Sequence, residues 1–345
     1  MADTNARVLL TTYPTGMPQP SDFKLVNEPL PQPKKGEVLV RTIYMSLDPY
    51  MRGRMSPNFK SYMAPVELGN PPPATAVGEV IASEDPSLNK GDLVHGMAGW
   101  QSHWVAEAKT LRRIQPSQTP LSYELGMLGM PGLTAYVGLL FFGEPKAGET
   151  VFVSAATGAV GSVVGQIAKI KGCKVVGIAS TEEKCKFAVE ELGYDACVNH
   201  HKGNLRQVLK EAAPNGIDIN FENVGGDIFW DVLALMNLNG RAVICGAIAS
   251  YNATRQEQGL DRTAELLTSI VVRRLQLKGI LVSDHFHRYA EFRKDMAQWM
   301  EQGKLKYRED IVQGLDNVVP AFQGLLEGKN FGKLVVQLHP DPARK

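Results

Sequence analysis

The sequence predicts an α/β protein in which a small β-barrel or curled sheet is joined to a parallel sheet with helices on both faces. Residues 1 to about 125 hold short β-rich runs broken by Pro and Gly. From about residue 150, predicted strands alternate with predicted helices, the rhythm of a doubly wound parallel sheet. A chain of 345 residues is also long enough for about two domains.

The β-rich runs of the first region cover residues 7–12, 36–47, 77–83, 92–96 and 102–106. Strands this short, with turn residues between them, indicate a barrel or curled sheet rather than stacked helices. The tail, about residues 305–338, returns to short mixed elements and ends in a predicted strand at 333–338. We expect this tail to rejoin the first region.

The second region follows a regular order. We predict strand 151–154, helix 160–171, strand 175–179, helix 182–192, strand 217–221, helix 227–235, strand 242–245, strand 277–282 and helix 285–302. Gly172 is expected to end the first of these helices, because Gly often follows a helix C-terminus.

Composition argues against several function classes. The net charge is +1, with Lys+Arg 37 against Asp+Glu 36, so neither nucleic acid nor a membrane surface is an expected partner. The N-terminus lacks a secretory pattern, and no run of about 18 apolar residues occurs. The four cysteines are widely spaced and form no C-x-x-C, which is typical of reduced thiols. We expect a cytoplasmic protein.

The strongest local motif lies at residues 151–165. Ala156, Gly158 and Gly161 match G-x-G-x-x-G with Ala at the first position, directly after a strand and at the start of a helix. Gly lets the backbone approach a pyrophosphate, whose charge meets the N–H groups of the helix N-terminus. Gly165 would let the helix pack close to the sheet. Glycine turns also join strands and helices for structural reasons alone, but this context favours a dinucleotide.

The end of the second strand favours NADP over NAD. An NAD site usually carries Asp or Glu there, whereas this chain has Ser180. Lys184 lies one helical turn further and is a candidate ligand of a 2′-phosphate, with a solvated helix face as the alternative. Glu182 and Glu183 would repel a phosphate, but Ser180 and Glu183 have the spacing of a capping box, which gives Glu183 a structural role.

Five motifs in order, at residues 47–55, 128–136, 221–226, 245–252 and 328–333, resemble the zinc-independent medium-chain dehydrogenase/reductases. That family includes leukotriene B4 12-hydroxydehydrogenase/prostaglandin reductases, plant alkenal double-bond reductases and bacterial NADPH-dependent curcumin reductases. The pair His200 and His201 and residues 250–254 are most similar to the bacterial curcumin reductases.

The resemblance implies a GroES-like β-barrel substrate domain, residues 1–125 and 305–345, and a Rossmann domain that binds NADPH, residues 126–304. It also implies the residues that hold the cofactor. These are Gly158, Val160 and Gly161 at the pyrophosphate, Ser180 and Lys184 at the 2′-phosphate, and Asn223, Cys245, Tyr251, Ile280, Leu281, Val282 and Asn330 elsewhere. His200 stands where mammalian and plant relatives carry Tyr, and it could seat the phosphate when protonated.

No metal site is expected. Zinc needs Cys, His or carboxylate ligands, and the first region contains no cysteine. His95 and His103 lack a zinc motif, and His285 and His287 have no evident third ligand.

Two tyrosines are the catalytic candidates. Hydride delivery to the β-carbon of an enone places negative charge on the carbonyl oxygen, which a phenol hydroxyl would stabilise. Tyr251 follows a strand end, where function is favoured, and Tyr50 lies in the first motif. The alternative for each is a half-buried rim residue.

The expected function is NADPH-dependent reduction of the C=C bond of α,β-unsaturated ketones or aldehydes, including curcumin-like enones. A quinone reductase and a non-catalytic NADPH-binding protein remain the alternatives. By the resemblance we also expect a homodimer joined at a sheet edge of the dinucleotide domain.

Overall fold

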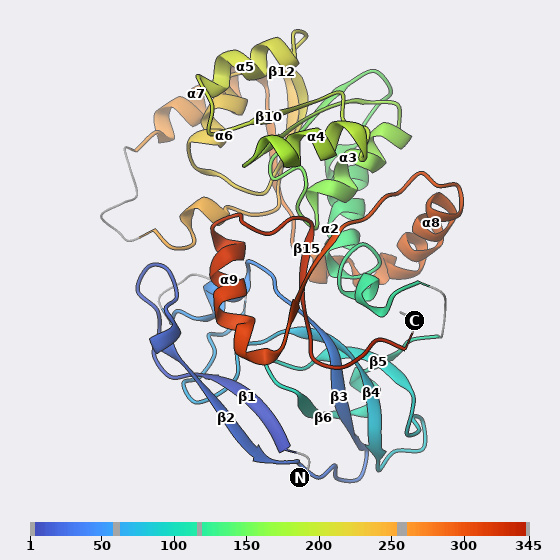
Figure 1. Cartoon of the computed structure of the whole chain (residues 1–345). Coiled ribbons are helices and arrows are strands. Elements are labelled where there is room, and N and C mark those ends of the chain that lie inside the picture. The colour runs from blue at the N-terminus through green and yellow to red at the C-terminus, as the bar shows by residue number, and fades with distance from the viewer. Residues whose placement is uncertain (1–3, 58–62, 116–118, 254–260, 343–345) are drawn as a thin grey trace. The chain divides into compact units, whose positions relative to one another are not determined.

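The computed structural model describes residues 4–57, 63–115, 119–253 and 261–342. The chain forms two compact units. The first combines Met1–Gly126 with Glu309–Asn330 and Leu334–Lys345, and the second combines Met127–Arg308 with Phe331–Lys333. Figure 1 traces the chain through both.

The first unit contains a seven-stranded sheet. Its strands run in the order β14 (Glu309–Gln313), β15 (Lys333–Gln337), β3 (Glu37–Ser46), β4 (Thr75–Ser83), β5 (Leu93–Met97) and β7 (Arg112–Arg113), and β6 (His103–Glu107) pairs with β3. A separate antiparallel pair joins β1 (Thr4–Leu10) and β2 (Phe23–Pro29). Val335 of β15 pairs with Ser46 of β3, so the C-terminal tail rejoins the first region.

Aromatic and methionine side chains fill the core of this unit. Trp100 is fully buried, and its ring lies 5.4 Å from those of both Phe23 and Phe322. The helices of the unit are α1 (Met51–Arg54) and α9 (Val318–Leu326), with short turns η1 (Pro20–Asp22), η2 (Ala108–Thr110), η3 (Leu121–Leu125) and η8 (Leu315–Asn317).

The second unit is built on a six-stranded parallel sheet. Its order is β10 (Ala196–Asn199), β9 (Lys174–Ala179), β8 (Thr150–Val153), β11 (Ile217–Glu222), β12 (Met236–Ile244) and β13 (Gln276–Gly279). In chain order this is 3-2-1-4-5-6, the doubly wound arrangement, and strand order reverses between β8 and β11.

Helices cover both faces of this sheet. Successive strand residues point to opposite faces, and Val151, Phe152 and Val153 of β8 are all fully buried. The helices are α2 (Met130–Val137), α3 (Gly161–Ile170), α4 (Glu182–Glu190), α5 (Leu205–Ala212), α6 (Gly226–Leu233), α7 (Thr263–Arg273) and α8 (Tyr289–Glu301), with η4 (Gly138–Gly143), η5 (Ile248–Ser250) and η7 (Val282–Arg288) between them.

The predicted order of strands and helices agrees with the structure, but three boundaries of the second unit are wrong. The strand expected at 242–245 begins six residues earlier, as β12 spans Met236–Ile244. The strand expected at 277–282 ends at Gly279, and the helix expected from 285 begins at Tyr289, because residues 282–288 form the turn η7. Strand β10 and helices α2, α5 and α7 of this unit were not predicted. Gly172 does follow the end of α3 and has φ 79°, as expected of a helix-ending glycine.

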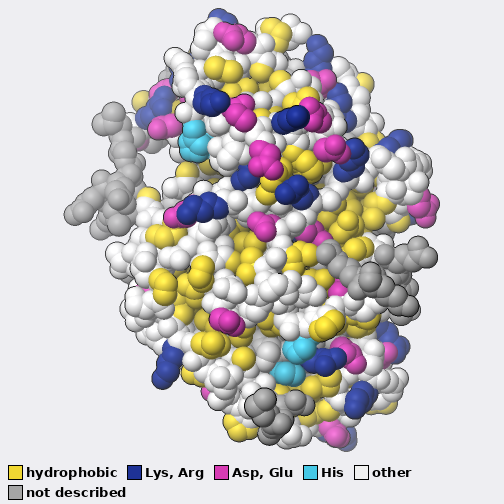
Figure 2. Space-filling model, in the orientation of Figure 1, with side chains coloured by type: hydrophobic (Ala, Val, Ile, Leu, Met, Phe, Trp, Pro, Cys, Tyr) yellow, Lys and Arg dark blue, Asp and Glu magenta, His cyan; other side chains and the backbone are white. Residues whose placement is uncertain are grey.

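Lys and Arg side chains are interspersed with Asp and Glu on the face shown in Figure 2, as the near-zero net charge predicts. Across the ranges that the structure describes, no helix has both the length and the apolar character needed to cross a membrane.

Candidate functional site

The turn between β8 and α3 closes tightly because it is built from small residues. Ala155 adopts the left-handed conformation with φ 51°, and its carbonyl oxygen accepts the Gly158 N–H at 2.9 Å. A Cβ at Gly161 would collide with that carbonyl, and a Cβ at Gly158 would lie 3.2 Å from it. Only glycine at position 161 therefore allows the helix to begin this close to the turn.

The helix N-terminus that follows suits an anion. Val160 is the N-cap of α3, no side chain caps the helix, and its first turn contains no acidic residue. The helix dipole places partial positive charge at this end. The N–H groups of Ser162 and Val163 donate to the carbonyl oxygens of Gly158 and Val160, both at 3.0 Å. This cradle fits a pyrophosphate.

A tyrosine that the sequence reasoning missed supports the turn from below. The Tyr194 hydroxyl donates to the carbonyl oxygen of Gly161 at 2.8 Å and lies 3.3 Å from that of Ala156. A Cβ at Gly165 would collide with the Tyr194 ring. We expected Gly165 to let the helix pack directly on the sheet. The structure shows instead that the absence of a side chain at Gly165 makes room for the Tyr194 ring.

Lys184 and Ser180 meet at the end of β9. The Lys184 Nζ donates to the Ser180 Oγ at 3.2 Å, and Lys184 is only 6% exposed, so it does not lie on a solvated helix face. The predicted capping box is wrong by one residue. Thr181 is the N-cap of α4 and accepts the Lys184 N–H at 3.2 Å. Ser180 therefore lies outside the helix.

Glu182, one of the two acids that complicated the NADP prediction, is paired with other side chains. It accepts a hydrogen bond from the Asn199 Nδ2 at 3.1 Å and forms a 3.0 Å ion pair with Lys202. The hydrogen bonds from Lys202 and Asn199 lower the pKa of Glu182. Glu182 thus has partners of its own at the protein surface.

His200 lies beside the same strand end. Its Nδ1 is 2.9 Å from the carbonyl oxygen of Ala179, the residue before Ser180. Burial lowers the pKa of His200, and the nearby charges of His201 and Lys184 lower it further. The ring is therefore mainly neutral near pH 7 in the absence of an anion.

At the ends of β8 and β11 a hydrogen-bond network holds Asn223. Its backbone N–H donates to the Ser154 Oγ at 2.7 Å, and its Nδ2 donates to the Ser154 carbonyl oxygen at 2.8 Å. The Ser154 hydroxyl donates in turn to the Glu222 Oε1 at 2.7 Å. Ser154 and Glu222 were not predicted, although the acid directly before Asn223 in the motif at residues 221–226 was a visible signal.

The end of β12 carries Cys245 and leads to Tyr251. Burial raises the pKa of Cys245 to about 12, with a contribution from Glu222, so the thiol is protonated. Tyr251 follows η5 and is half-buried, and burial raises its pKa as well. A Cβ at Gly246 would lie 3.4 Å from the Tyr251 hydroxyl, so glycine leaves space beside it. Residue 254 of the adjoining motif lies outside the described residues.

The segment after β13 lies beside the end of β12. The Ile280 N–H donates to the Ile244 carbonyl oxygen at 3.0 Å, and Ile280, Leu281 and Val282 are all half-buried. All the predicted cofactor residues except Asn330 thus belong to the second unit, at the ends of its strands or in the turns and first helical turns that follow them.

Tyr50 and Asn330 belong to the first unit. Tyr50 directly precedes α1 and packs, half-buried, against the core that contains Met51 and Met55. Both methionines are fully buried, as is Met45, whereas Met63 is 38% exposed. The first three are therefore ordinary core residues.

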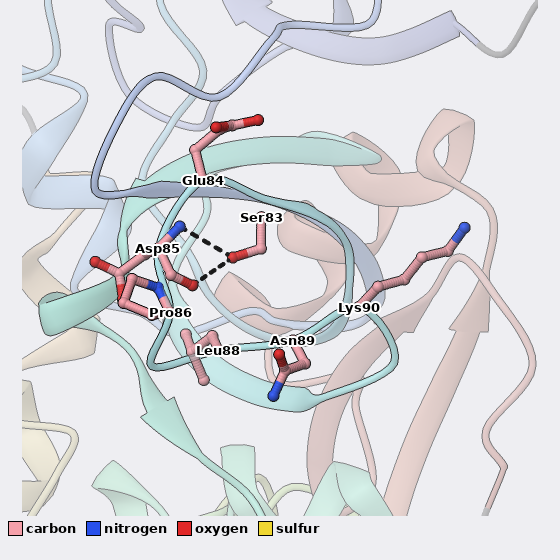
Figure 3. A pocket seen from close by; sticks show the side chains of 7 residues that line it. All are labelled: Ser83, Glu84, Asp85, Pro86, Leu88, Asn89 and Lys90. Carbon is pink, nitrogen blue, oxygen red and sulfur yellow. Dashed lines mark hydrogen bonds between the residues drawn. The ribbon is translucent and has the colours of Figure 1, made fainter.

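A shallow pocket of the first unit lies elsewhere, in the turn between β4 and β5 (Figure 3). Two hydrogen bonds between Ser83 and Asp85 stabilise this turn, and none of the predicted site residues lines the pocket. Among the described side chains, no group of three or more His, Cys, Asp or Glu is arranged to hold a metal ion.

Comparison with known proteins gives consistent matches. Residues 6–114 match the family model described as the N-terminal domain of oxidoreductase, and residues 159–302 match that described as zinc-binding dehydrogenase. The chain is 46% identical to NADPH-dependent curcumin reductase of Escherichia coli, with 98% of each chain covered. It is 41% identical to the NADP(+)-dependent 2-alkenal reductase of Nicotiana tabacum, with 97% of this chain and 98% of that protein covered.

A solved structure is also similar. The crystal structure of CurA from Vibrio vulnificus in complex with NADPH has a TM-score of 0.93 and 46% identity, and the match covers 97% of this chain and 99% of that one.

Proposed function

The chain belongs to the medium-chain dehydrogenase/reductase family that includes curcumin, 2-alkenal and prostaglandin reductases, and we propose that it reduces α,β-unsaturated ketones and aldehydes. It is an NADPH-dependent oxidoreductase that acts on C=C bonds. One observation carries the proposal. In a chain this similar to enone reductases, the segments after the strands of the second unit bring together residues suited to bind the pyrophosphate and the 2′-phosphate of NADPH.

The cofactor would be held by the residues assembled above. Gly158, Val160 and Gly161 offer the pyrophosphate a close backbone and a helix N-terminus. At the 2′-phosphate, Ser180 and Lys184 supply a hydroxyl and a cation, with His200 beside them. The remaining contacts are proposed for Asn223, Cys245, Tyr251, Ile280, Leu281, Val282 and Asn330.

Bound NADPH would supply the hydride that adds to the β-carbon of the substrate. The protein's task is to orient the enone and to stabilise the enolate oxygen that forms. We assign the second task to Tyr251, with Tyr50 as the other candidate. Burial raises the pKa of Tyr251, which keeps its hydroxyl protonated and able to donate a hydrogen bond.

The first unit would bind the substrate. We propose that its seven-stranded sheet is the GroES-like barrel of the family and that residues 1–125 and 305–345 form the substrate domain around a Rossmann domain at 126–304. The pairing of β15 with β3, which joins the two chain ends in one sheet, supports this division.

Two further proposals concern assembly and location. Helix α7 exposes Leu267, Val271 and Val272, which are 57%, 75% and 61% exposed, and β13 is an edge strand of the sheet. An exposed apolar helix face and an edge strand in the same unit both fit contact with a second copy of the chain, so we propose a homodimer.

For location we propose the cytoplasm, because four free cysteines fit a reducing compartment.

The decisive experiment is to incubate the purified protein with NADPH and panels of enones, quinones and alkanals. We expect enones to be consumed with loss of NADPH absorbance and with reduction of the C=C bond in the product. Turnover of quinones alone would indicate a quinone reductase. NADPH binding without any turnover would indicate a non-catalytic protein.

A further inference from the structure

Glu222 is a buried acid at the end of β11 whose side chain organises the adjoining loops. It is 1% exposed. Its Oε1 accepts three hydrogen bonds, from the Ser154 hydroxyl at 2.7 Å and from the backbone N–H groups of Val224 and Gly225 at 2.7 and 2.9 Å. The carboxylate thus stabilises the turn that follows β11 and connects this turn to Ser154 at the end of β8.

The backbone of the same residue reaches a third strand. The Glu222 carbonyl oxygen accepts the N–H groups of Cys245 and Gly246, at 2.8 and 3.1 Å, at the end of β12. One residue therefore connects the carboxyl ends of β8, β11 and β12. In a doubly wound sheet, a dinucleotide binds at the carboxyl ends of the strands, at the point where strand order reverses.

The position of the Asn223 side chain and backbone depends on this carboxylate. Asn223 is held by the Ser154 hydroxyl and carbonyl, and that hydroxyl can accept the Asn223 N–H at 2.7 Å while donating its own proton to Glu222. Removing the charge of Glu222 weakens the three hydrogen bonds that its Oε1 accepts, because hydrogen bonds to an ionised acceptor are about twice as strong as neutral ones. One of these bonds fixes the Ser154 hydroxyl, to which the Asn223 N–H donates.

We propose that Glu222 is a positioning residue, whose carboxylate holds residues 223–225 and Ser154 in the arrangement that receives the nicotinamide half of NADPH. It acts through these neighbours. The proposal rests on the proposed function for the identity of the cofactor, and it assigns Glu222 no part in the 2′-phosphate site at Ser180 and Lys184.

The test uses Glu222→Gln in the full-length protein. Gln has nearly the same shape as Glu, and its amide N–H can find an acceptor. The Asn220 Oδ1 is buried without a hydrogen-bond partner, and rotation of the Asn220 amide turns it towards residue 222. If the binding-competent arrangement falls to about a tenth of the population, the dissociation constant for NADPH rises about tenfold. Adenosine 2′-phosphate, which lacks the nicotinamide half, should bind within about twofold of wild type.

Both ligands are titrated by calorimetry or ligand-observed NMR, and thermal unfolding is measured in parallel. The matched control is Asp218→Asn, at the opposite end of the same strand. Asp218 also accepts a backbone N–H, that of Thr150 at 2.8 Å, and a side-chain amide, that of Asn237 at 2.8 Å. It should leave both dissociation constants unchanged.

Unchanged NADPH affinity in Glu222→Gln would overturn the proposal, and so would an equal weakening of both ligands, which indicates general damage. Should Glu222→Gln fail to fold, Ser154→Ala breaks the same network and must weaken NADPH selectively. Because binding is the readout, the result stands whether or not the wild-type protein reduces enones. Failure of the proposed function would appear separately in the substrate panel.

Discussion

Replacing Lys184 with Ala is predicted to weaken NADPH binding and to leave NADH binding nearly unchanged. Lys184 is 6% exposed, and its Nζ lies 3.2 Å from the Ser180 Oγ, at the strand end where the 2′-phosphate is expected. Hydrogen bonds to charged groups contribute about 1.5–3 kcal/mol, and about 1.4 kcal/mol corresponds to a tenfold change. The dissociation constant for NADPH should therefore rise roughly 10- to 150-fold.

The buried stem of Lys184 requires a control, because Ala also removes its packing. Lys184→Met keeps an unbranched apolar side chain and removes the ammonium group, with its charge and its hydrogen bond to Ser180. Fluorescence titration with NADPH and NADH, together with thermal unfolding, should show both variants losing NADPH affinity by similar factors. Equal loss of NADPH and NADH affinity in both variants would show that Lys184 does not bind the 2′-phosphate. Loss in Lys184→Ala alone would indicate packing.

Four other predictions concern catalysis, pH, metal and assembly. Tyr251→Phe should lower kcat and kcat/KM together, by about tenfold to 1000-fold, with little change in NADPH affinity. A wild-type rate in Tyr251→Phe together with a slower Tyr50→Phe would assign the enolate oxygen to Tyr50 instead. A 2′-phosphate should raise the lowered pKa of His200, so that NADPH affinity increases as pH falls through the pKa that His200 has in the complex. His200→Asn should lack this component, and identical pH profiles would refute it. Activity should survive a chelator, with elemental analysis finding no stoichiometric zinc; one zinc per chain and inactivation on its removal would contradict this. Sedimentation should give twice the chain mass of 37.8 kDa, and Val271→Asp should release monomers; a wild-type monomer at micromolar concentration would exclude the dimer.

The parts of the site that could be predicted from the sequence depend on short stretches of chain. The glycine turn follows from local backbone geometry, since Gly158 and Gly161 lie within six residues of the left-handed Ala155. Ser180 and Lys184 are four residues apart, and one helical turn brings them together. Even here the capping residue was misplaced, because Ser and Thr at positions 180 and 181 both suit an N-cap and only the observed start of α4 distinguishes them.

The missed residues act across long separations in sequence. Tyr194 supports the turn through Gly161 and Ala156, 33 and 38 residues away. Strand β10 was missed because it is a half-buried edge strand of four residues, without an alternating apolar pattern. A local pattern carries no information about which distant strand will lie beside it.

Glu222 shows most clearly why sheet order has to be known before a site can be completed. Its main side-chain partner, Ser154, is 68 residues away, and the two meet only because β11 pairs directly with β8, with Phe221 opposite Val153. The sequence shows a strand that ends in an acid and another that ends in a serine, but each has several possible neighbours. Once the order 3-2-1-4-5-6 is fixed, the acid lies at the reversal point, where the backbone N–H groups of Val224 and Gly225 donate to it. That placement makes Glu222 an anchor of the cofactor loops, whereas the same residue at the opposite end of the strand, where Asp218 lies, would only join strands.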